Sequence, residues 1–180
     1  MKTVILFGSP RKNGNTIQLA QAMVDTLKKK GHSVRMLYLN DLNIRPCQGC
    51  YTCLKNGSCK INDDMKDICK YILESDLIVY ATPIYWFGAS AQLKLVMDRS
   101  IAFMDNDYNS RVAGKKAITL ITFADNNMDT CKPAIDMFKK TFDLLKLTYV
   151  GSIEVPGCTD GGSIEEEYKK KTKKLIDSFA

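Results

Sequence analysis

Residues 2–16 read Lys2-Thr3-Val4-Ile5-Leu6-Phe7-Gly8-Ser9-Pro10-Arg11-Lys12-Asn13-Gly14-Asn15-Thr16. The first six form a largely apolar, non-alternating run, which is typical of a strand buried on both faces of a parallel sheet. The next nine are small, hydroxyl, amide or basic residues, and an amphipathic segment follows them at once. The stretch therefore predicts a buried strand, a tight turn and a helix, which together form the repeating unit of a parallel α/β sheet.

The same alternation of short apolar runs and longer amphipathic segments continues through the 180 residues. Strands are expected at 2–7, 33–39, 76–81, 115–123 and 147–155, and helices at 15–30, about 63–73, 90–103, 133–145 and 163–179. Five strands alternating with five helices predict one domain over residues 1–180, with a doubly wound five-stranded parallel sheet in the order 2-1-3-4-5 and helices on both faces. The last helix is expected to begin with a capping box, in which Ser163 is the N-cap and Glu166 the N3 residue.

Composition and charge restrict the classes of partner. Hydrophobic residues make up 45% of the chain and charged residues 26%, and no stretch approaches the roughly 20 apolar residues of a membrane span. The N-terminal apolar run is too short for a signal peptide, so we expect a cytoplasmic protein without a membrane partner. The net charge of +6 arises from 26 basic and 20 acidic residues spread along the chain, which does not favour a nucleic-acid partner.

The turn Gly8–Thr16 has the composition of a phosphate-binding loop. Backbone N–H groups, small polar side chains and a helix N-terminus converge there, and Arg11 adds a positive charge. The turn lacks the lysine of a P-loop, because Asn15 follows Gly14, and it lacks the three-glycine spacing of a dinucleotide fingerprint. A plain strand-to-helix turn would explain the glycines and asparagines but not nine such residues in succession. The loop therefore favours the phosphate of a mononucleotide.

A second unusual loop, Thr82–Ala89, follows the third expected strand and contains three consecutive aromatic residues. In a sheet of this order, the loops after the first and third strands meet at the crevice beyond the carboxyl ends of the strands. A planar ligand lying against Tyr85, Trp86 and Phe87 accounts for the aromatic run. Packing of the same residues at a subunit interface is an alternative that is compatible with the ligand.

The two loops together resemble those of the NAD(P)H-dependent FMN reductase family, which has a flavodoxin-like fold. The resemblance covers roughly the first 100 residues and includes a helix with the pattern Lys-x3-Asp-Arg at Lys94, Asp98 and Arg99. It implies that FMN binds with its phosphate in the first loop and its ring against the second. The cofactor-binding residues that it implies are Ser9, Arg11, Asn13, Gly14, Asn15, Thr16, Pro83, Ile84, Tyr85, Trp86, Phe87 and Gly88. The chain departs from the family at 122–127, where relatives often carry a glycine-rich stretch, so a third segment against the ring is not assigned.

Four of the seven cysteines lie in the loop at about 41–61, with the spacing C-x2-C-x2-C-x5-C. These are Cys47, Cys50, Cys53 and Cys59. The compact run is typical of [4Fe–4S] ligation, whereas a zinc site usually has two separated C-x2-C pairs. Free thiols or a redox-active pair at Cys50 and Cys53 remain alternatives. With this segment included, the chain resembles the iron–sulfur flavoprotein branch of the family, which implies that all four residues ligate a [4Fe–4S] cluster.

The resemblance implies an FMN-dependent oxidoreductase that moves electrons from NADPH, NADH or a reduced ferredoxin to a small-molecule or protein acceptor. One alternative is an electron carrier between ferredoxin and a partner, without direct NAD(P)H oxidation. Another is a regulatory or scaffold protein that has lost its flavin. No pair of titratable residues suggests separate acid–base catalysis, so no catalytic side chain is predicted. Relatives of this type are commonly dimers, and we expect a homodimer or a larger homo-oligomer.

Overall fold

The computed structural model describes residues 1–159 and 162–179. Its strands are β1 (Lys2–Phe7), β2 (Ser33–Tyr38), β3 (Leu77–Tyr85), β4 (Gly88–Ala89), β5 (Lys116–Thr122) and β6 (Thr148–Val155). Its α-helices are α1 (Asn15–Lys29), α2 (Thr52–Asn56), α3 (Met65–Glu74), α4 (Ala91–Asp98), α5 (Lys132–Leu144) and α6 (Glu166–Asp177). Short 3-10 turns lie at Leu39–Asp41, Ser100–Phe103 and Met128–Cys131.

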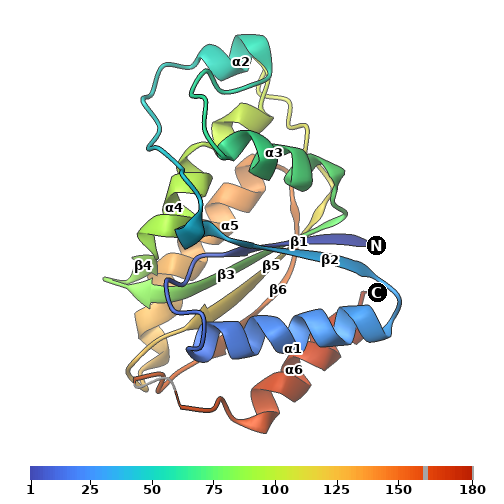
Figure 1. Ribbon diagram of the computed structural model, residues 1–180, viewed down its shortest axis with the longest axis vertical. Coiled ribbons are helices and arrows are strands. Elements are labelled where there is room, and N and C mark those ends of the chain that lie inside the picture. The colour runs from blue at the N-terminus through green and yellow to red at the C-terminus, as the bar shows by residue number, and fades with distance from the viewer. Residues whose placement is uncertain (160–161, 180) are drawn as a thin grey trace.

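The five long strands are parallel and lie in the order β2-β1-β3-β5-β6 (Figure 1). Since β5 and β6 correspond to the fourth and fifth expected strands, the predicted order 2-1-3-4-5 is confirmed. The two-residue strand β4 was not expected, and it pairs antiparallel with the end of β3. The sheet is the parallel α/β arrangement that the apolar runs predicted.

Helices cover both faces of the sheet, with α1 and α6 on one face and α3, α4 and α5 on the other (Figure 1). Alternate residues of the strands therefore point into two separate apolar cores. In β1, for example, Val4 and Leu6 pack with α3 and α4, whereas Ile5 and Phe7 pack with α1. Burial on both faces explains why this strand is apolar throughout instead of alternating.

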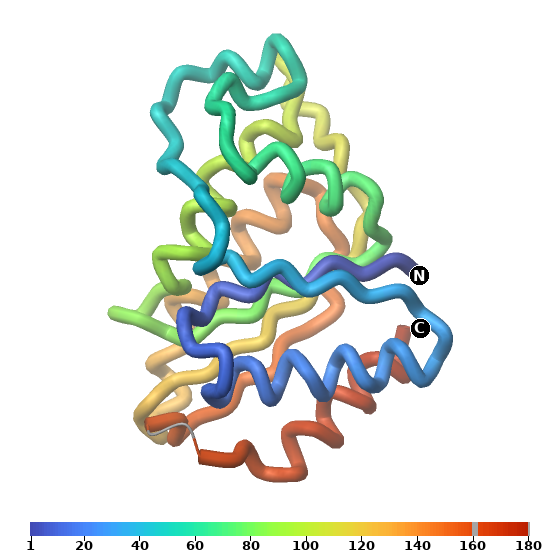
Figure 2. The backbone as a smooth tube through the Cα atoms, in the orientation of Figure 1, coloured from blue at the N-terminus to red at the C-terminus, as the bar shows by residue number. Residues whose placement is uncertain are grey.

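The cysteine segment leaves the sheet after β2, reaches α2 at one end of the molecule and returns to form α3 (Figure 2). The helix α2 has only five residues and was not predicted. Residues in the left-handed backbone region stand at both of its ends, Tyr51 with φ 54° and Gly57 with φ 66°. The Arg111 side chain donates a hydrogen bond of 2.5 Å to the Gly57 carbonyl, which ties α2 to the body of the protein.

Three expected boundaries are wrong. Strand β3 continues to Tyr85, because Thr82 and Pro83 stay in register with β5. The helix expected at 90–103 ends at Asp98 and continues as a 3-10 turn. The capping box is also wrong, since α6 begins at Glu166 after the N-cap Glu165. The residues before it are held extended, because the Ile164 N–H donates to the Gln18 side chain at 3.1 Å.

No helix in the described part of the chain is long and apolar enough to cross a membrane.

Candidate functional site

A cavity of about 200 Å³ lies where the end of β3 meets the loops after β1, β5 and β6, at the carboxyl ends of the strands. This is the position at which parallel α/β sheets bind ligands. The described residues that line it are Arg11, Gly14, Asn15, Thr16, Pro83, Ile84, Tyr85, Thr122, Phe123, Ala124, Cys158 and Thr159. Arg11 carries the one formal charge among them, so the cavity favours an anionic ligand.

The start of the first loop is packed closely against α4. The Gly8 N–H donates to the Ala81 carbonyl at 2.8 Å, and a Cβ on Gly8 would lie 2.7 Å from Ser90 Oγ and 2.8 Å from Leu93 Cβ. Only glycine allows this close approach. The buried Ser9 hydroxyl accepts a hydrogen bond from the Arg11 N–H at 3.2 Å and thereby closes the turn.

Two polar side chains of the loop connect it to distant segments. The Thr16 and Thr122 hydroxyls share a buried hydrogen bond of 2.7 Å, which joins the loops after β1 and β5. The Asn15 amide donates to the Gly162 carbonyl at 2.7 Å, so it helps to hold the segment before α6. With these side chains engaged, the loop can bind an anion through Arg11 and through the backbone N–H groups at the start of α1, which include those of Asn15 and Thr16.

The aromatic residues form a β-hairpin that projects beyond the end of the sheet (Figure 1). Its two turn residues, Trp86 with φ 48° and Phe87 with φ 64°, lie in the left-handed region, as a type I′ turn requires. Asn and Gly usually occupy these positions, and bulky aromatic residues there are strained. Trp86 is 96% exposed. Strain combined with exposure points to a role beyond folding.

The structure thus brings together seven of the twelve residues expected to bind the cofactor. Arg11, Gly14, Asn15, Thr16, Pro83, Ile84 and Tyr85 line the cavity, whereas Ser9, Asn13, Trp86, Phe87 and Gly88 lie outside its lining. Sequence reasoning did not assign the lining residues Thr122, Phe123, Ala124, Cys158 and Thr159. The place of the first three at the end of a central strand was an available signal; Cys158 and Thr159 carried none.

All four clustered cysteines, Cys47, Cys50, Cys53 and Cys59, line a second cavity, of about 220 Å³. It lies at the α2 end of the molecule (Figure 1). Among the described residues, no group of three or more His, Cys, Asp or Glu side chains is placed to hold a single metal ion.

Arg99 also lines this cavity, although only 1% of its side chain is exposed. Its Nη1 lies 2.5 Å from the equally buried Asp63 carboxylate and donates to the Arg45 carbonyl at 3.2 Å. Its Nε and Nη2 atoms are buried and make no hydrogen bond with any residue that the structure describes. Burial by itself lowers the pKa of Arg99, but Asp63 and the Cys59 sulfur outweigh it and raise the pKa. The only sequence signal for this residue was the Lys-x3-Asp-Arg pattern.

Helix α4 runs between the two cavities. At its N-terminus, Ser90 donates to the Gly8 carbonyl at 2.7 Å, and the Ser90 N–H donates to the Thr82 hydroxyl at 3.0 Å. At its C-terminus stands Arg99. Eight helical residues span about 12 Å. Helix α4 therefore connects Gly8 and Thr82, which lie next to the first cavity, to the wall of the cysteine cavity.

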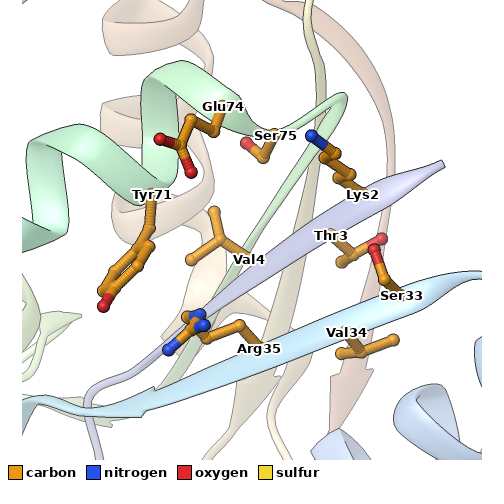
Figure 3. Close-up of a pocket in the computed structure, with 9 residues that line it drawn as sticks. All are labelled: Lys2, Thr3, Val4, Ser33, Val34, Arg35, Tyr71, Glu74 and Ser75. Carbon is orange, nitrogen blue, oxygen red and sulfur yellow. The ribbon is translucent and has the colours of Figure 1, made fainter.

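A further hollow, of about 230 Å³, lies between α3 and the starts of β1 and β2 (Figure 3). The side chains of Lys2, Arg35, Tyr71 and Glu74 surround it, and the Arg35 guanidinium lies 4.2 Å from the centre of the Tyr71 ring. The hollow is at the opposite edge of the sheet from the loops that form the first cavity, and ligands of such sheets bind at the carboxyl edge. We therefore do not count it as part of the site.

Comparison with known proteins places this geometry in a family. Residues 1–158 match the family of NADPH-dependent FMN reductases. An iron-sulfur flavoprotein of Archaeoglobus fulgidus is 32% identical over 182 residues, which cover 100% of this chain and 79% of that protein. An iron-sulfur flavoprotein of Methanocaldococcus jannaschii is 40% identical over 100 residues, which cover 56% of this chain and about half (52%) of that protein.

Solved structures agree on the fold. The FMN-dependent NADH-azoreductase of Bacillus anthracis, solved in complex with FMN, superposes with a TM-score of 0.74 at 12% identity and covers 100% of both chains. At that identity the likeness concerns the fold alone. The loop Gly8–Thr16 contributes to the cavity at the carboxyl ends of the strands, where this type of sheet binds its ligands. Together with this arrangement, the match over residues 1–158 shows that the chain belongs to the NADPH-dependent FMN reductase family.

Proposed function

We propose that the protein is an FMN-dependent oxidoreductase that moves electrons from NADPH, NADH or a reduced ferredoxin to a small-molecule or protein acceptor. The observation that carries the proposal is the cavity between the loop after β1 and the end of β3, in which Arg11 is the one charged residue of the described lining. When bound, FMN supplies the capacity to accept and release electrons singly or in pairs. The protein binds and orients the cofactor, and no catalytic side chain is proposed.

The residues present fit FMN. The cavity lining combines Arg11 and the start of α1, which can bind an anion, with Pro83, Ile84, Tyr85 and Phe123, which offer apolar and aromatic surface to a ring. In this arrangement Arg11, Gly14, Asn15 and Thr16 hold the phosphate. Pro83, Ile84 and Tyr85 lie against the ring, while Ser9 and Asn13 shape the loop. Trp86, Phe87 and Gly88 act from the neighbouring hairpin, which extends the surface on which a ring can lie.

The cysteine cavity fits a [4Fe–4S] cluster on Cys47, Cys50, Cys53 and Cys59. All four cysteines line one cavity, and their compact spacing is typical of [4Fe–4S] ligation, whereas a zinc site usually has two separated C-x2-C pairs. The buried Arg99 has hydrogen-bond donors without an acceptor beside this space, and an anionic cluster would supply one. The names of the two archaeal relatives support the same assignment.

Binding of FMN is tested by titrating the flavin-free protein and following flavin fluorescence. Arg11→Gln removes the charge in the cavity and is expected to weaken FMN binding at least tenfold, about 1.4 kcal/mol. Riboflavin, which lacks the phosphate, should bind equally to both proteins. Lys12→Gln is the matched control, because Lys12 is exposed and paired with Asp41 outside the cavity. Equal loss of FMN and riboflavin binding in Arg11→Gln, or no loss, would contradict the proposal.

A second candidate is an electron carrier that receives electrons from ferredoxin and does not oxidise NAD(P)H. The cysteine cavity and the iron-sulfur relatives favour it. Stopped-flow reduction by NADPH, NADH and reduced ferredoxin separates the two functions. Rapid flavin reduction by a nicotinamide nucleotide supports the oxidoreductase, and reduction by ferredoxin alone supports the carrier.

A further inference from the structure

We infer that Arg99 is a positioning residue for the iron–sulfur cluster and donates hydrogen bonds from Nε and Nη2 to the sulfur atoms of the cluster and its ligand Cys59. The inference rests on the proposed cluster and deepens it, because it identifies a residue that is not a ligand yet acts on the bound centre. The observations that carry it are the burial of Arg99, its place in the cavity wall and its unused donors.

A guanidinium group has five N–H donors and stays charged in proteins. In the structure Nη1 uses its two donors on the Asp63 carboxylate and the Arg45 carbonyl. The remaining three donors, one on Nε and two on Nη2, make no geometrically complete hydrogen bond with a described residue, although the Cys59 side chain interacts with the guanidinium. Buried donors of a charged group are normally satisfied. An acceptor is therefore missing on the side of the guanidinium that Asp63 does not occupy.

The Asp63 carboxylate prevents the guanidinium from turning to find another acceptor. Besides Arg99, it accepts hydrogen bonds from the N–H groups of Arg45 at 2.9 Å and Met65 at 3.2 Å. The carboxylate is thus fixed to the backbone on both sides of the cysteine segment. Because it fixes Nη1 in turn, the unused edge of Arg99 is held in the wall of the cavity that the four cysteines line. The Cys59 side chain, which interacts with the guanidinium, is the ligand next to that edge.

A cluster held by four thiolates is anionic, and reduction adds a further negative charge. Hydrogen bonds to its sulfur atoms stabilise the reduced form more than the oxidised form and raise the reduction potential. Lys60 lines the same cavity, but it is exposed, so solvent screens its charge. The buried donors of Arg99 should therefore affect the potential more than the Lys60 charge does.

The test reconstitutes the 180-residue chain anaerobically with iron and sulfide. It measures the iron and sulfide content, the midpoint potential of the cluster and its EPR spectrum. Arg99→Lys keeps the charge beside Asp63 but cannot supply the planar set of donors. We expect the equilibrium constant for reduction of the cluster to be at least tenfold lower in this variant. For a one-electron couple, this is a fall of 59 mV in the midpoint potential. Lys60→Gln is the control and should change the same equilibrium less than threefold.

The double variant Asp63→Asn with Arg99→Gln removes both buried charges together, and it provides the comparison if Arg99→Lys does not fold. The inference is supported by a folded variant that binds less iron and sulfide than the wild type, or by one whose bound cluster has a lower midpoint potential. Folded variants with wild-type cluster content and potential would overturn it. A wild-type protein that takes up no iron and sulfide would instead overturn the proposed cluster, and the inference with it.

Discussion

The Asp63–Arg99 pair is the main buried charge interaction that the structure describes. Both side chains are at most 1% exposed, and the two charged groups approach to 2.5 Å. Taking two ions out of water is costly, and their attraction repays the cost only where the geometry is good and the other polar atoms have partners. The carboxylate meets this condition, whereas the guanidinium does not. The pair is therefore explained better by a ligand in the cysteine cavity than by stability alone.

Asp63→Asn should destabilise the protein by about 3–5 kcal/mol, because it leaves the Arg99 charge buried without a partner. The free energy of unfolding in urea measures the effect. Asp64→Asn is the control. Asp64 is exposed, and its carboxylate accepts a hydrogen bond from the Asn43 N–H but does not pair with Arg99. An equal decrease in the free energy of unfolding in both variants would show that the buried pair contributes no more to stability than an exposed carboxylate does.

The Asp63–Arg99 pair predicts that the stability of the folded protein depends on pH. Burial alone raises the pKa of Asp63, but hydrogen bonds from Arg99 and the Arg45 N–H outweigh it and lower the pKa. A carboxylate with a lowered pKa in the folded state stabilises the protein above its unfolded-state pKa of about 3.9, and this contribution is lost as the pH falls below that value. Unfolding measured from pH 7 to pH 3 should therefore show a smaller acid-induced loss of stability in Asp63→Asn than in the wild type.

Gly8 is the position in the phosphate-binding loop that tolerates least change. Gly8→Ala should cost about 1–3 kcal/mol of stability, because its Cβ would overlap Ser90 Oγ and Leu93 Cβ. The displaced loop should also bind FMN less tightly. Gly88→Ala is the control for stability alone, because Gly88 belongs to the proposed ring surface; the nearest atom to its Cβ, the Tyr85 carbonyl oxygen, is at an ordinary 3.8 Å. Urea unfolding of both variants and FMN titration of Gly8→Ala against the wild type check the expectation.

At the scale of elements, the hairpin of β3 and β4 combines strain with exposure. Replacing Trp86 by Asn and Phe87 by Gly supplies the residues that a type I′ turn prefers. The double variant should be more stable by about 1–2 kcal/mol, because left-handed backbone is costly for bulky residues, yet it should bind FMN less tightly. Lys146→Gly relieves a similar φ of 55° outside both cavities and should gain stability with unchanged FMN binding. Unchanged FMN affinity in the hairpin variant would remove the hairpin from the site.

Elements with a continuous apolar pattern were predictable from the sequence, and elements fixed by distant contacts were not. The strands were predicted because burial on both faces makes them apolar throughout, and the long helices because their buried face repeats every 3.6 residues. Helix α2 is too short for a periodic pattern and depends on the contact between Arg111 and Gly57. The start of α6 depends on Gln18, which is 146 residues away from Ile164. The burial of Arg99 was not predicted, because nothing near it in the sequence reveals Asp63.

For the candidate site, the same distinction holds. The loop Gly8–Thr16 is a local motif, and Arg11 and Thr16 line the cavity; that they bind the cofactor stays a prediction. The five lining residues that were not assigned come from the ends of β5 and β6, and they join the site only through the order of the strands. The four cysteines were found by spacing, whereas the buried charge beside them was not.

At the scale of the whole molecule, the aromatic hairpin predicts the oligomeric state. Tyr85, Trp86 and Phe87 are 45%, 96% and 56% exposed and lie beside the cavity proposed for FMN. An exposed aromatic cluster of this kind is typical of an interface, and a second copy of the chain would cover both the hairpin and the outer face of the flavin. We therefore expect a homodimer or a larger homo-oligomer by light scattering.

Trp86→Glu should shift the protein toward monomer and weaken FMN binding at least tenfold, because a buried charge opposes association and the flavin loses its cover. Leu144→Glu is the matched control, since Leu144 is 58% exposed but does not line the proposed FMN cavity. It should leave both the mass in solution and the FMN affinity unchanged. A wild-type monomer that binds FMN would contradict the expectation, because one chain would then cover both faces of the flavin without the exposed aromatic residues finding a partner.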